Sequence, residues 1–204
     1  MEELKCGNYC MLRGTVREPP RLSHRSRQEE FYQFSLEVSR LSGAVDTIHI
    51  IARAALLDAL EIGGGGKLCV KGELRSFNNR SGVGPRLVIT VFARELWFDD
   101  GEDENTVELS GVLCKPPTLR VTPMGREISD LMLAVRRRYG RSDYLPCIAW
   151  GSSARAAACW DVGCAVRLTG RIQSRQYLKA ENGETVEKTA YEVSIIHIEP
   201  EDEE

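Results

Sequence analysis

The feature that most constrains this sequence is an internal repeat with a period of about 97 residues. Gly14 and Gly111 are 97 positions apart, and so are Asp46 and Asp143. The same spacing relates Pro19-Pro20 to Pro116-Pro117, Leu22 to Leu119, Gly43 to Gly140, Ile51-Ala52 to Ile148-Ala149, and the trio Phe34, Leu36 and Val38 to Leu131, Leu133 and Val135. Self-similarity at a fixed period means that one structural unit occurs more than once. We therefore predict two domains of one fold, over residues 1–98 and 105–199.

The acidic residues are concentrated outside these two copies. The net charge of the whole chain is −3, but residues 99–104 include five acids and residues 201–204 are all acidic. The rest of the chain has 27 basic and 21 acidic residues. We interpret residues 99–104 as an acidic linker and 200–204 as an acidic tail. The folded copies are then mildly basic, which suits an anionic partner.

Composition excludes several classes of protein. No apolar run approaches the length of a membrane span, and the start Met1-Glu-Glu-Leu-Lys lacks the basic-then-apolar order of a signal peptide. We expect a cytoplasmic protein that does not enter a membrane. The seven cysteines form no Cys-x-x-Cys pair, and the chain has only three histidines. We therefore expect reduced thiols and neither a metal site nor a cofactor.

Alternating apolar positions predict a chain made mostly of strands. In the second copy we predict strands over 107–113, 128–137, 144–150, 165–174 and 189–198, the last preceded by the hairpin signal Asn182-Gly183. A short helix over 154–160 is expected after Ser152-Ser153, whose hydroxyls can cap its first turn. The order strand, strand, strand, helix, strand, strand over about ninety residues is typical of the OB-fold. The fold class predicted is all-β, with two tandem five-stranded OB-fold barrels that each have one short helix.

The third predicted strand has the candidate binding face. With a period of two, Tyr144, Pro146, Ile148 and Trp150 point to one side, and the small apolar residues between them point into the barrel. Cations and further rings surround this strand in the sequence: Arg136, Arg137, Arg138, Tyr139, Arg141, Arg171, Arg175, Tyr177 and Lys179. Rings interleaved with cations suit stacked bases and their phosphates. The alternative is that Tyr144 and Trp150 cover a subunit contact and that the arginines are only solvated.

Five segments of the second copy together carry a family resemblance: the opening strand Asn105–Gly111, Leu133–Arg137, Tyr144–Gly151, Val166–Arg175 and Thr189–Val193. As a set they resemble the bacterial single-stranded DNA-binding protein family. In that family, aromatic residues of the second, third and fourth strands stack on bases. By position, the resemblance implies this role for Tyr144, Trp150 and Tyr177, with Tyr139 as a fourth candidate.

The sequence departs from the family in its doubled fold and in its tail. Most members have one barrel per chain and form tetramers, so the resemblance implies a homodimer with four barrels for this chain. The long Gly/Pro/Gln-rich tail of the family is missing, and the tail here is acidic without a terminal hydrophobic pair. This speaks against the family's usual docking of repair and replication partners.

The first copy lacks the rings of the second. Thr47 stands at the position of Tyr144, Arg53 at that of Trp150, and Asn79 near that of Tyr177. We expect residues 1–98 to be mainly structural, with Arg53 offering a phosphate contact or lying on a base. The rings of Phe31-Tyr32 and Phe77 are interpreted as core or interface residues.

No enzyme motif is present. Gly63–Gly66 is not followed by the Lys-Ser or Lys-Thr of a phosphate loop, and the acids Glu127, Asp130, Asp143 and Asp161 are scattered over loops and turns. The predicted function is sequence-independent binding and protection of single-stranded DNA in replication, recombination or repair. The alternative is an OB-fold protein-interaction module, an accessory of replication that binds nucleic acid weakly.

Overall fold

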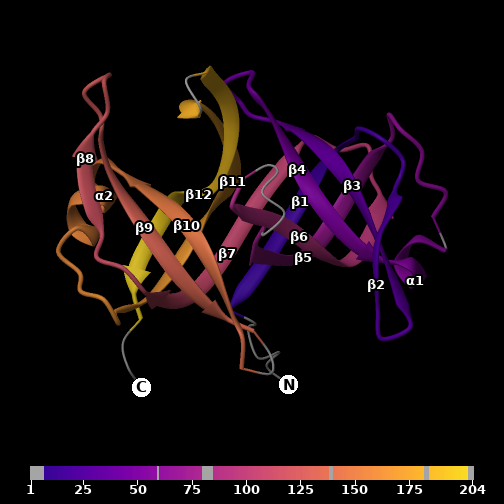
Figure 1. Ribbon diagram of the computed structural model, residues 1–204, viewed down its shortest axis with the longest axis horizontal. Coiled ribbons are helices and arrows are strands. Elements are labelled where there is room, and N and C mark those ends of the chain that lie inside the picture. Colours follow the sequence, from indigo (N-terminus) through magenta and orange to yellow (C-terminus); the bar gives the residue numbers. More distant parts are fainter. Residues whose placement is uncertain (1–6, 59, 80–84, 138–139, 182–183, 202–204) are drawn as a thin grey trace. The chain divides into compact units, whose positions relative to one another are not determined.

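The chain folds into two compact units (Figure 1). The structure is a computed structural model that describes residues 7–58, 60–79, 85–137, 140–181 and 184–201, with the backbone alone for 178–181 and 184. The N-terminal unit comprises Tyr9–Arg75 and Ile89–Thr106, and the C-terminal unit comprises Met1–Asn8, Ser76–Val88 and Val107–Glu204. Residues 76–88 thus belong to the C-terminal unit, although they lie in the first copy of the sequence repeat.

The N-terminal unit is a six-stranded barrel with one helical turn. Its elements are β1 (Asn8–Val16), β2 (Arg21–Ser26), β3 (Glu29–Ser39), β4 (Val45–Arg53), α1 (Ala54–Leu57), β5 (Lys67–Asn78) and β6 (Leu87–Phe98). The strand order is β2-β3-β4-β6-β5-β1, and β1 also pairs with β3, which closes the barrel. All described pairings in this unit are antiparallel except that of β4 with β6.

The C-terminal unit repeats this topology. Its elements are β7 (Glu104–Leu113), β8 (Thr118–Val121), β9 (Glu127–Arg136), β10 (Ser142–Trp150), α2 (Gly151–Ala157), β11 (Ala165–Glu181) and β12 (Glu184–Pro200). The strand order is β8-β9-β10-β12-β11-β7, closed by β7 with β9, and β10 runs parallel to β12. Two closed barrels, each with one short helix, confirm the predicted OB-fold class.

The repeated glycines lie where each barrel closes. A Cβ on Gly14 would lie 2.5 Å from the carbonyl oxygen of Glu37, and a Cβ on Gly111 would lie 2.6 Å from that of Ala134. Neither distance is possible for a real side chain, so only glycine allows the first strand to reach the third. The closing registers, Thr15 with Glu37 and Val112 with Ala134, are themselves 97 residues apart.

A buried ion pair is repeated in the same way. Asp46 and Asp143 have no exposed surface. The Nε of Arg40 donates to Asp46 Oδ2 at 2.6 Å, and the Nε of Arg137 donates to Asp143 Oδ2 at 2.6 Å. In both copies the guanidinium makes a second hydrogen bond to the same carboxylate. A carboxylate removed from water needs such a paired, hydrogen-bonded partner, so the repeated aspartate has a structural role.

The predicted interior positions are confirmed in both barrels. Phe34, Leu36 and Val38 of β3 are buried, and so are their counterparts Leu131, Leu133 and Val135 of β9. Period-two burial of this kind is the signal on which the strand prediction depends.

Three local features differ from the prediction. Each barrel has a sixth strand, β2 or β8, which the sequence did not indicate because all of its residues are exposed and show no alternation. The helix α2 begins directly at Gly151, which has φ +55°, and ends at Ala157. The predicted serine cap is therefore wrong, since no side chain caps the helix.

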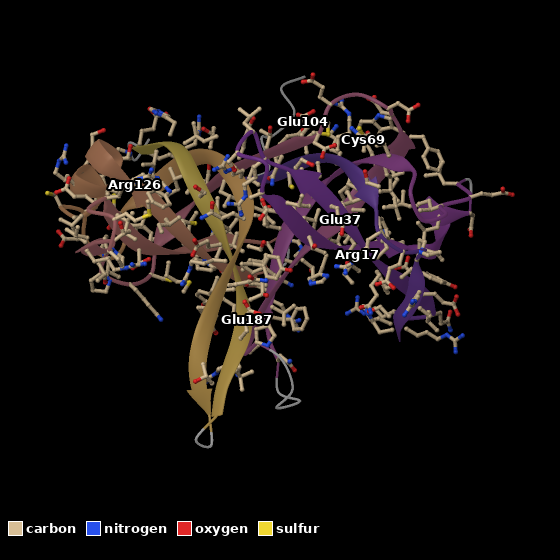
Figure 2. The ribbon with its side chains drawn as sticks, turned by 90° about the horizontal axis from the view of Figure 1, so that it is seen from above. Arg17, Glu37, Cys69, Glu104, Arg126 and Glu187 are labelled. Carbon is tan, nitrogen blue, oxygen red and sulfur yellow. The ribbon has the colours of Figure 1, made fainter. Side chains whose placement is uncertain are left out.

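The predicted fourth and fifth strands of the second copy are both longer than expected. Strands β11 and β12 remain paired as far as Glu181 with Glu184. Figure 2 shows this two-stranded arm near Glu187. The hairpin signal Asn182-Gly183 lies outside the described residues, but the strands it should connect do pair.

The acidic segment 99–104 contacts the barrel of its own unit. Arg13 pairs with Asp99 at 3.1 Å, and Lys67 pairs with Asp103 at 2.9 Å. The backbone N–H of Ser39 donates to Asp103 Oδ2 at 2.7 Å. The acids at 99 and 103 are therefore held against strands β1, β3 and β5.

Candidate nucleic-acid interface

Strand β10 places its two predicted rings differently. Tyr144, at the start of the strand, is 52% exposed, and Trp150, at its end, is half-buried. Leu145, Cys147 and Ala149 fill the barrel interior as predicted. The prediction that Ile148 faces solvent is wrong: it is buried, on a strand that pairs with β9 on one side and with β12 on the other.

Trp150 is held in place by a hydrogen bond. Its Nε1 donates to the hydroxyl of Ser194 on β12 at 3.1 Å. Ser194 is also the antiparallel register partner of Arg171 on β11. Register partners in a sheet point to the same face, so the side chains of Trp150, Ser194 and Arg171 are all on the outer face of the barrel. The Nε of Arg171 is buried and has no hydrogen-bond partner in the described part of the chain.

The same outer face continues along β11 toward the arm. Alternation places Arg175 and Tyr177 on the same side of β11 as Arg171. Ile172, the residue that follows Arg171, points to the other side and is buried in the interior. The guanidinium of Arg175 lies 5.6 Å from the ring centre of Tyr177, within cation–π distance. Arg175 also faces Glu192 at 3.8 Å. We call Trp150, Arg171, Arg175 and Tyr177 the β11 face.

Arg137 is used by the fold. Besides its ion pair with Asp143, its Nη2 donates to the carbonyl oxygen of Ser76 at 3.0 Å. The backbone N–H of Ser76 donates to Asp143 at 2.5 Å, and the Oγ of Ser76 accepts from the backbone N–H of Tyr144 at 2.8 Å. Arg137 therefore fixes residue 76 beside β10, which leaves it poorly placed to contact a phosphate.

The other residues predicted to bind nucleic acid do not form one surface with these. Arg136 and Arg141 are exposed beside the start of β10. Arg138 and Tyr139 lie outside the described residues, and Lys179 is described only by its backbone. Arg53, in the N-terminal unit, is exposed and lies 3.5 Å from Glu29 and 5.8 Å from the ring centre of Phe92.

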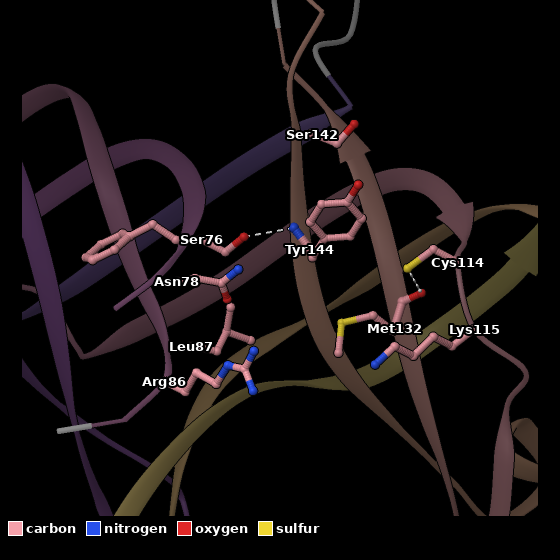
Figure 3. Close-up of a pocket in the computed structure, with 10 residues that line it drawn as sticks. Ser76, Asn78, Arg86, Leu87, Cys114, Lys115, Met132, Ser142 and Tyr144 are labelled. Carbon is pink, nitrogen blue, oxygen red and sulfur yellow. Dashed lines mark hydrogen bonds between the residues drawn. The ribbon is translucent and has the colours of Figure 1, made fainter. Parts of the chain in front are cut away.

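A pocket beside Tyr144 includes residues that were not predicted to bind. One of them is Phe77, interpreted from the sequence as a core or interface residue; it is not in the core, since it is 53% exposed. The volume of the pocket is about 720 Å³. It is lined by Ser76, Phe77, Asn78, Arg86, Leu87, Cys114, Lys115, Met132, Ser142 and Tyr144. Figure 3 shows Arg86 and Lys115 extending toward each other from different walls, with Tyr144 nearby. The signal that could have found Phe77 and Arg86 is a ring and a cation nine positions apart in the sequence.

Metal-ligating side chains and buried thiols also occur among the described residues. These residues include no group of three or more His, Cys, Asp or Glu side chains able to hold a metal ion. Burial raises the pKa of the Cys10 and Cys147 thiols, which keeps both protonated and unreactive. Within the described part of the chain, no helix has the length and apolarity needed to cross a membrane.

Comparison with protein families gives one match to the second copy. Residues 104–200 match the model of the single-strand binding protein family. The chain is 36% identical over 96 residues to the single-stranded DNA-binding protein B of Bacillus subtilis (strain 168), an alignment that covers 44% of this chain and 82% of that protein.

A second relative is aligned over a smaller part of its own length. The single-stranded DNA-binding protein 2 of Listeria innocua serovar 6a is 31% identical over 103 residues, which cover 47% of this chain and 65% of that protein. The chain spans between about half and two thirds of the length of the first curated relatives that it matches.

Among solved structures, the chain resembles the wild-type single-stranded DNA binding protein from Thermus aquaticus. The TM-score is 0.79 at 20% identity, with 97% of this chain and 94% of that chain covered. At this identity the likeness concerns the fold, and it extends over both copies. The match of the second copy to the B. subtilis protein concerns the sequence itself. The chain therefore belongs to the single-strand binding protein family.

Proposed function

We propose that this protein binds single-stranded DNA with little sequence preference and performs no chemistry on it. The observation that supports this most directly is the β11 face, where Trp150 and Tyr177 share one outer surface with Arg171 and Arg175. Every base has a π-face, so stacking on such rings is independent of sequence, and the cations follow the backbone. Tyr144 extends the set of exposed rings along β10.

The geometry assigns different tasks to the cations. Arg175 lies beside Tyr177 and is half exposed, so it can neutralise a phosphate next to a base stacked on that ring. Arg171 has a buried Nε without a partner in the described residues, an atom that a phosphate or base oxygen would satisfy. Arg136 and Arg141 contribute exposed charge near Tyr144. Arg137 acts indirectly, by positioning Ser76 and the start of β10.

We further propose that residues 105–199 are the main binding domain and that residues 1–98 are mainly structural. The ring positions Tyr144 and Trp150 correspond to Thr47 and Arg53 in the first copy. We also propose a homodimer, which would bring four barrels together, and a cytoplasmic role in replication, recombination or repair. Sedimentation equilibrium at several concentrations tests the dimer, and a monomer at micromolar concentration would exclude it.

The test of the function is a titration of intrinsic fluorescence with oligo(dT) of graded length, alongside a duplex of equal length. Quenching by the single strand, much weaker binding of duplex and no requirement for a metal ion are the expected results. Equal affinity for duplex and single strand would contradict the proposal. Feeble binding to both would favour the protein-interaction module instead.

A further inference from the structure

The strand β8 is an edge of the C-terminal unit that no described strand covers (Figure 1). It pairs with β9 on one side only, from Thr118 with Asp130 to Val121 with Glu127. In an antiparallel pair, every second residue directs its N–H and C=O away from the partner strand. These outward groups have no other backbone partner within the described residues. The free side of β8 therefore offers backbone donors and acceptors to an additional strand.

Apolar side chains on and beside β8 are exposed. Leu119 is 46% exposed and Val121 is 64% exposed, and alternation places both on one face of the strand. Met124, in the turn that follows, is 81% exposed. Neighbouring large apolar side chains left in water mark an interaction surface, in contrast to single ones.

The apolar face of β8 is on the side of the sheet where α2 lies. Leu119 is the register partner of Ser129, which is buried, and Val121 is the register partner of Glu127. Register partners point to the same face, and the carboxylate of Glu127 pairs with Arg155 of α2, which packs against β9. The apolar face of β8 is therefore separate from the outer barrel surface that has the β11 face.

The equivalent edge strand of the first copy, β2, is protected by charge. Arg25 is the register partner of Glu30, and Val121 is the register partner of Glu127, which is 97 positions after Glu30. The guanidinium of Arg25 also forms an ion pair with Glu30 at 2.7 Å. Charged side chains on an edge strand discourage pairing with other chains. The second copy has an exposed valine in that place, so its edge lacks this protection.

The charge left unpaired along this edge is positive. Asp130 is bonded by Arg120 at 3.1 Å, and Glu127 is bonded by an arginine of α2. Lys115, just before β8, and Arg126, after its turn, are exposed and form no ion pair with the described residues. Complementary charge steers and orients a partner, so this edge suits a partner that has acidic residues.

A second copy of this chain fits the edge less well. A two-fold antiparallel pair of β8 strands would bring Arg126 of one copy toward Lys115 of the other, and like charges repel. Residues 201–204 are acidic but include no apolar residue, so they cannot supply an alternating apolar face. The charges and the apolar face together favour a segment of another protein.

We propose that β8 docks an extended segment of a partner protein, which adds to the sheet as a further strand. The segment has apolar residues at alternate positions, which cover Leu119 and Val121, and acidic residues at its ends, which pair with Lys115 and Arg126. Backbone hydrogen bonds to the free edge supply affinity, and the alternating side chains supply specificity. This site goes beyond the proposed function, since it uses a face of the barrel other than the β11 face.

The probe is a fluorescein-labelled peptide of alternating valine and threonine with glutamates at both ends. Its binding to the full-length protein is followed by fluorescence anisotropy, and we expect a Kd below about 1 mM. A peptide with lysine in place of each glutamate should bind roughly fivefold more weakly. A peptide with a central proline, which interrupts the hydrogen bonds of a strand, should not bind. An acidic peptide that binds no better than these two overturns the proposal.

The apolar face is tested by the double variant Leu119→Thr with Val121→Thr, because threonine still favours a strand. The double variant should lose about tenfold in affinity for the acidic peptide. Leu22→Thr is the matched control, since Leu22 is the exposed counterpart of Leu119 on β2, and it should bind the peptide like the unmodified protein. Unchanged affinity in the folded double variant contradicts the site.

The charge and the position of the peptide are tested separately. Arg126→Gln should weaken binding of the acidic peptide about three- to fivefold and leave binding of a peptide with glutamines at its ends unchanged. Arg25→Gln, on β2, is the control and should affect neither. The amide protons of residues 118–121 should exchange more slowly when the peptide is bound, because the outward N–H groups become bonded. Protection confined to other segments would place the peptide elsewhere and overturn the proposal.

Binding to oligo(dT) separates this site from the proposed function. The β8 variants should bind oligo(dT) like the unmodified protein. An unmodified protein that binds the peptide but not oligo(dT) contradicts the proposed function alone. A loss of oligo(dT) affinity in Leu119→Thr with Val121→Thr, without a loss of peptide affinity, would assign the β8 edge to nucleic acid and overturn the proposal.

Discussion

The two barrels share their internal structure and differ on their outer faces. Gly14 and Gly111 allow the same closure, and Arg40–Asp46 and Arg137–Asp143 form the same buried pair. On the outer face the C-terminal unit has Trp150 bonded to Ser194. Residues that hold the barrel closed are thus repeated, whereas residues available to a ligand are not.

The N-terminal unit lacks a ring at the position of Trp150 but has one on the neighbouring strand. The parallel registers Ile50 with Val91 and Cys147 with Val193 place Phe92 at the position of Ser194. The N-terminal unit therefore has a cation, Arg53, where the other has a ring, and a ring where the other has a serine. Arg94 lies 4.9 Å from the centre of the Phe92 ring. A ring flanked by cations remains on this barrel, on the neighbouring strand.

The largest expected effect concerns the shared ion pair. Asp143→Ala should lower the free energy of unfolding by roughly 3–5 kcal/mol, because it leaves a mostly buried guanidinium without its partner. Asp46→Ala should cost a similar amount if both barrels depend on the same pair. Urea denaturation of each variant measures this. A variant that keeps full stability but loses DNA affinity would mean that its aspartate belongs to the binding site instead.

Such pairs show where sequence analysis succeeded and where it failed. The 97-residue spacing and the alternation of Leu131, Leu133 and Val135 predicted the barrels, because burial imposes period two on a strand. Asp143 was identified as a repeated position, but Arg137 was predicted to contact phosphate. An arginine on a hairpin has the same sequence signal whether it binds a ligand or a buried carboxylate six residues later.

The pocket could not be predicted from the sequence pattern, for a different reason. Its rings, Phe77 and Tyr144, are 67 residues apart and come from different copies of the repeat. No local period relates them, and comparing the copies aligns Asn79, not Phe77, with the ring of Tyr177. The hydrogen bonds of Ser76 to β10 and to Arg137 place the end of β5 there.

The next largest effect is the loss of oligo(dT) affinity when a ring is removed from the outer face of either barrel. Trp150→Ala should weaken oligo(dT) binding by about 1–3 kcal/mol, the range for one base–aromatic stack. Phe92→Ala should cost about 1 kcal/mol, at the lower limit of that range, because Arg53 and Arg94 already crowd its ring. Equal losses in fluorescence titrations would show that both barrels bind alike and would remove the proposed division of labour.

A smaller effect is expected from the acidic segment of the N-terminal unit. Partial burial opposes ionisation of Asp103, but hydrogen bonds from Ser39 and Lys67 outweigh it and lower its pKa. Asp103→Asn should therefore reduce stability at pH 7 by about 1–2 kcal/mol. A group with a lowered pKa stabilises the fold above its unfolded pKa of about 3.9 and loses that effect as the pH falls through the folded value.

The difference in the free energy of unfolding between Asp103→Asn and the unmodified protein should therefore be constant near neutrality and shrink below about pH 4. Thermal unfolding at a series of pH values measures it. Asp100→Asn is the matched control, since Asp100 is an exposed acid of the same segment and should change stability little at any pH. A difference that persists at low pH would show that the asparagine disturbs packing rather than removing a charge.

The smallest expected effect is the change in the salt dependence of binding when one of two neighbouring arginines is replaced. Arg136 is exposed, whereas Arg137 is bonded to Asp143 and Ser76. If Arg136 contacts one phosphate, Arg136→Gln should flatten the salt slope of oligo(dT) binding by about 0.7 and leave stability unchanged. Arg137→Gln should instead lower the urea midpoint, because glutamine cannot neutralise the buried carboxylate. Affinities at four salt concentrations and one denaturation curve per variant suffice. A change of slope in folded Arg137→Gln with no loss of stability would return this arginine to the binding surface and reduce the repeated pair to a feature of the N-terminal unit.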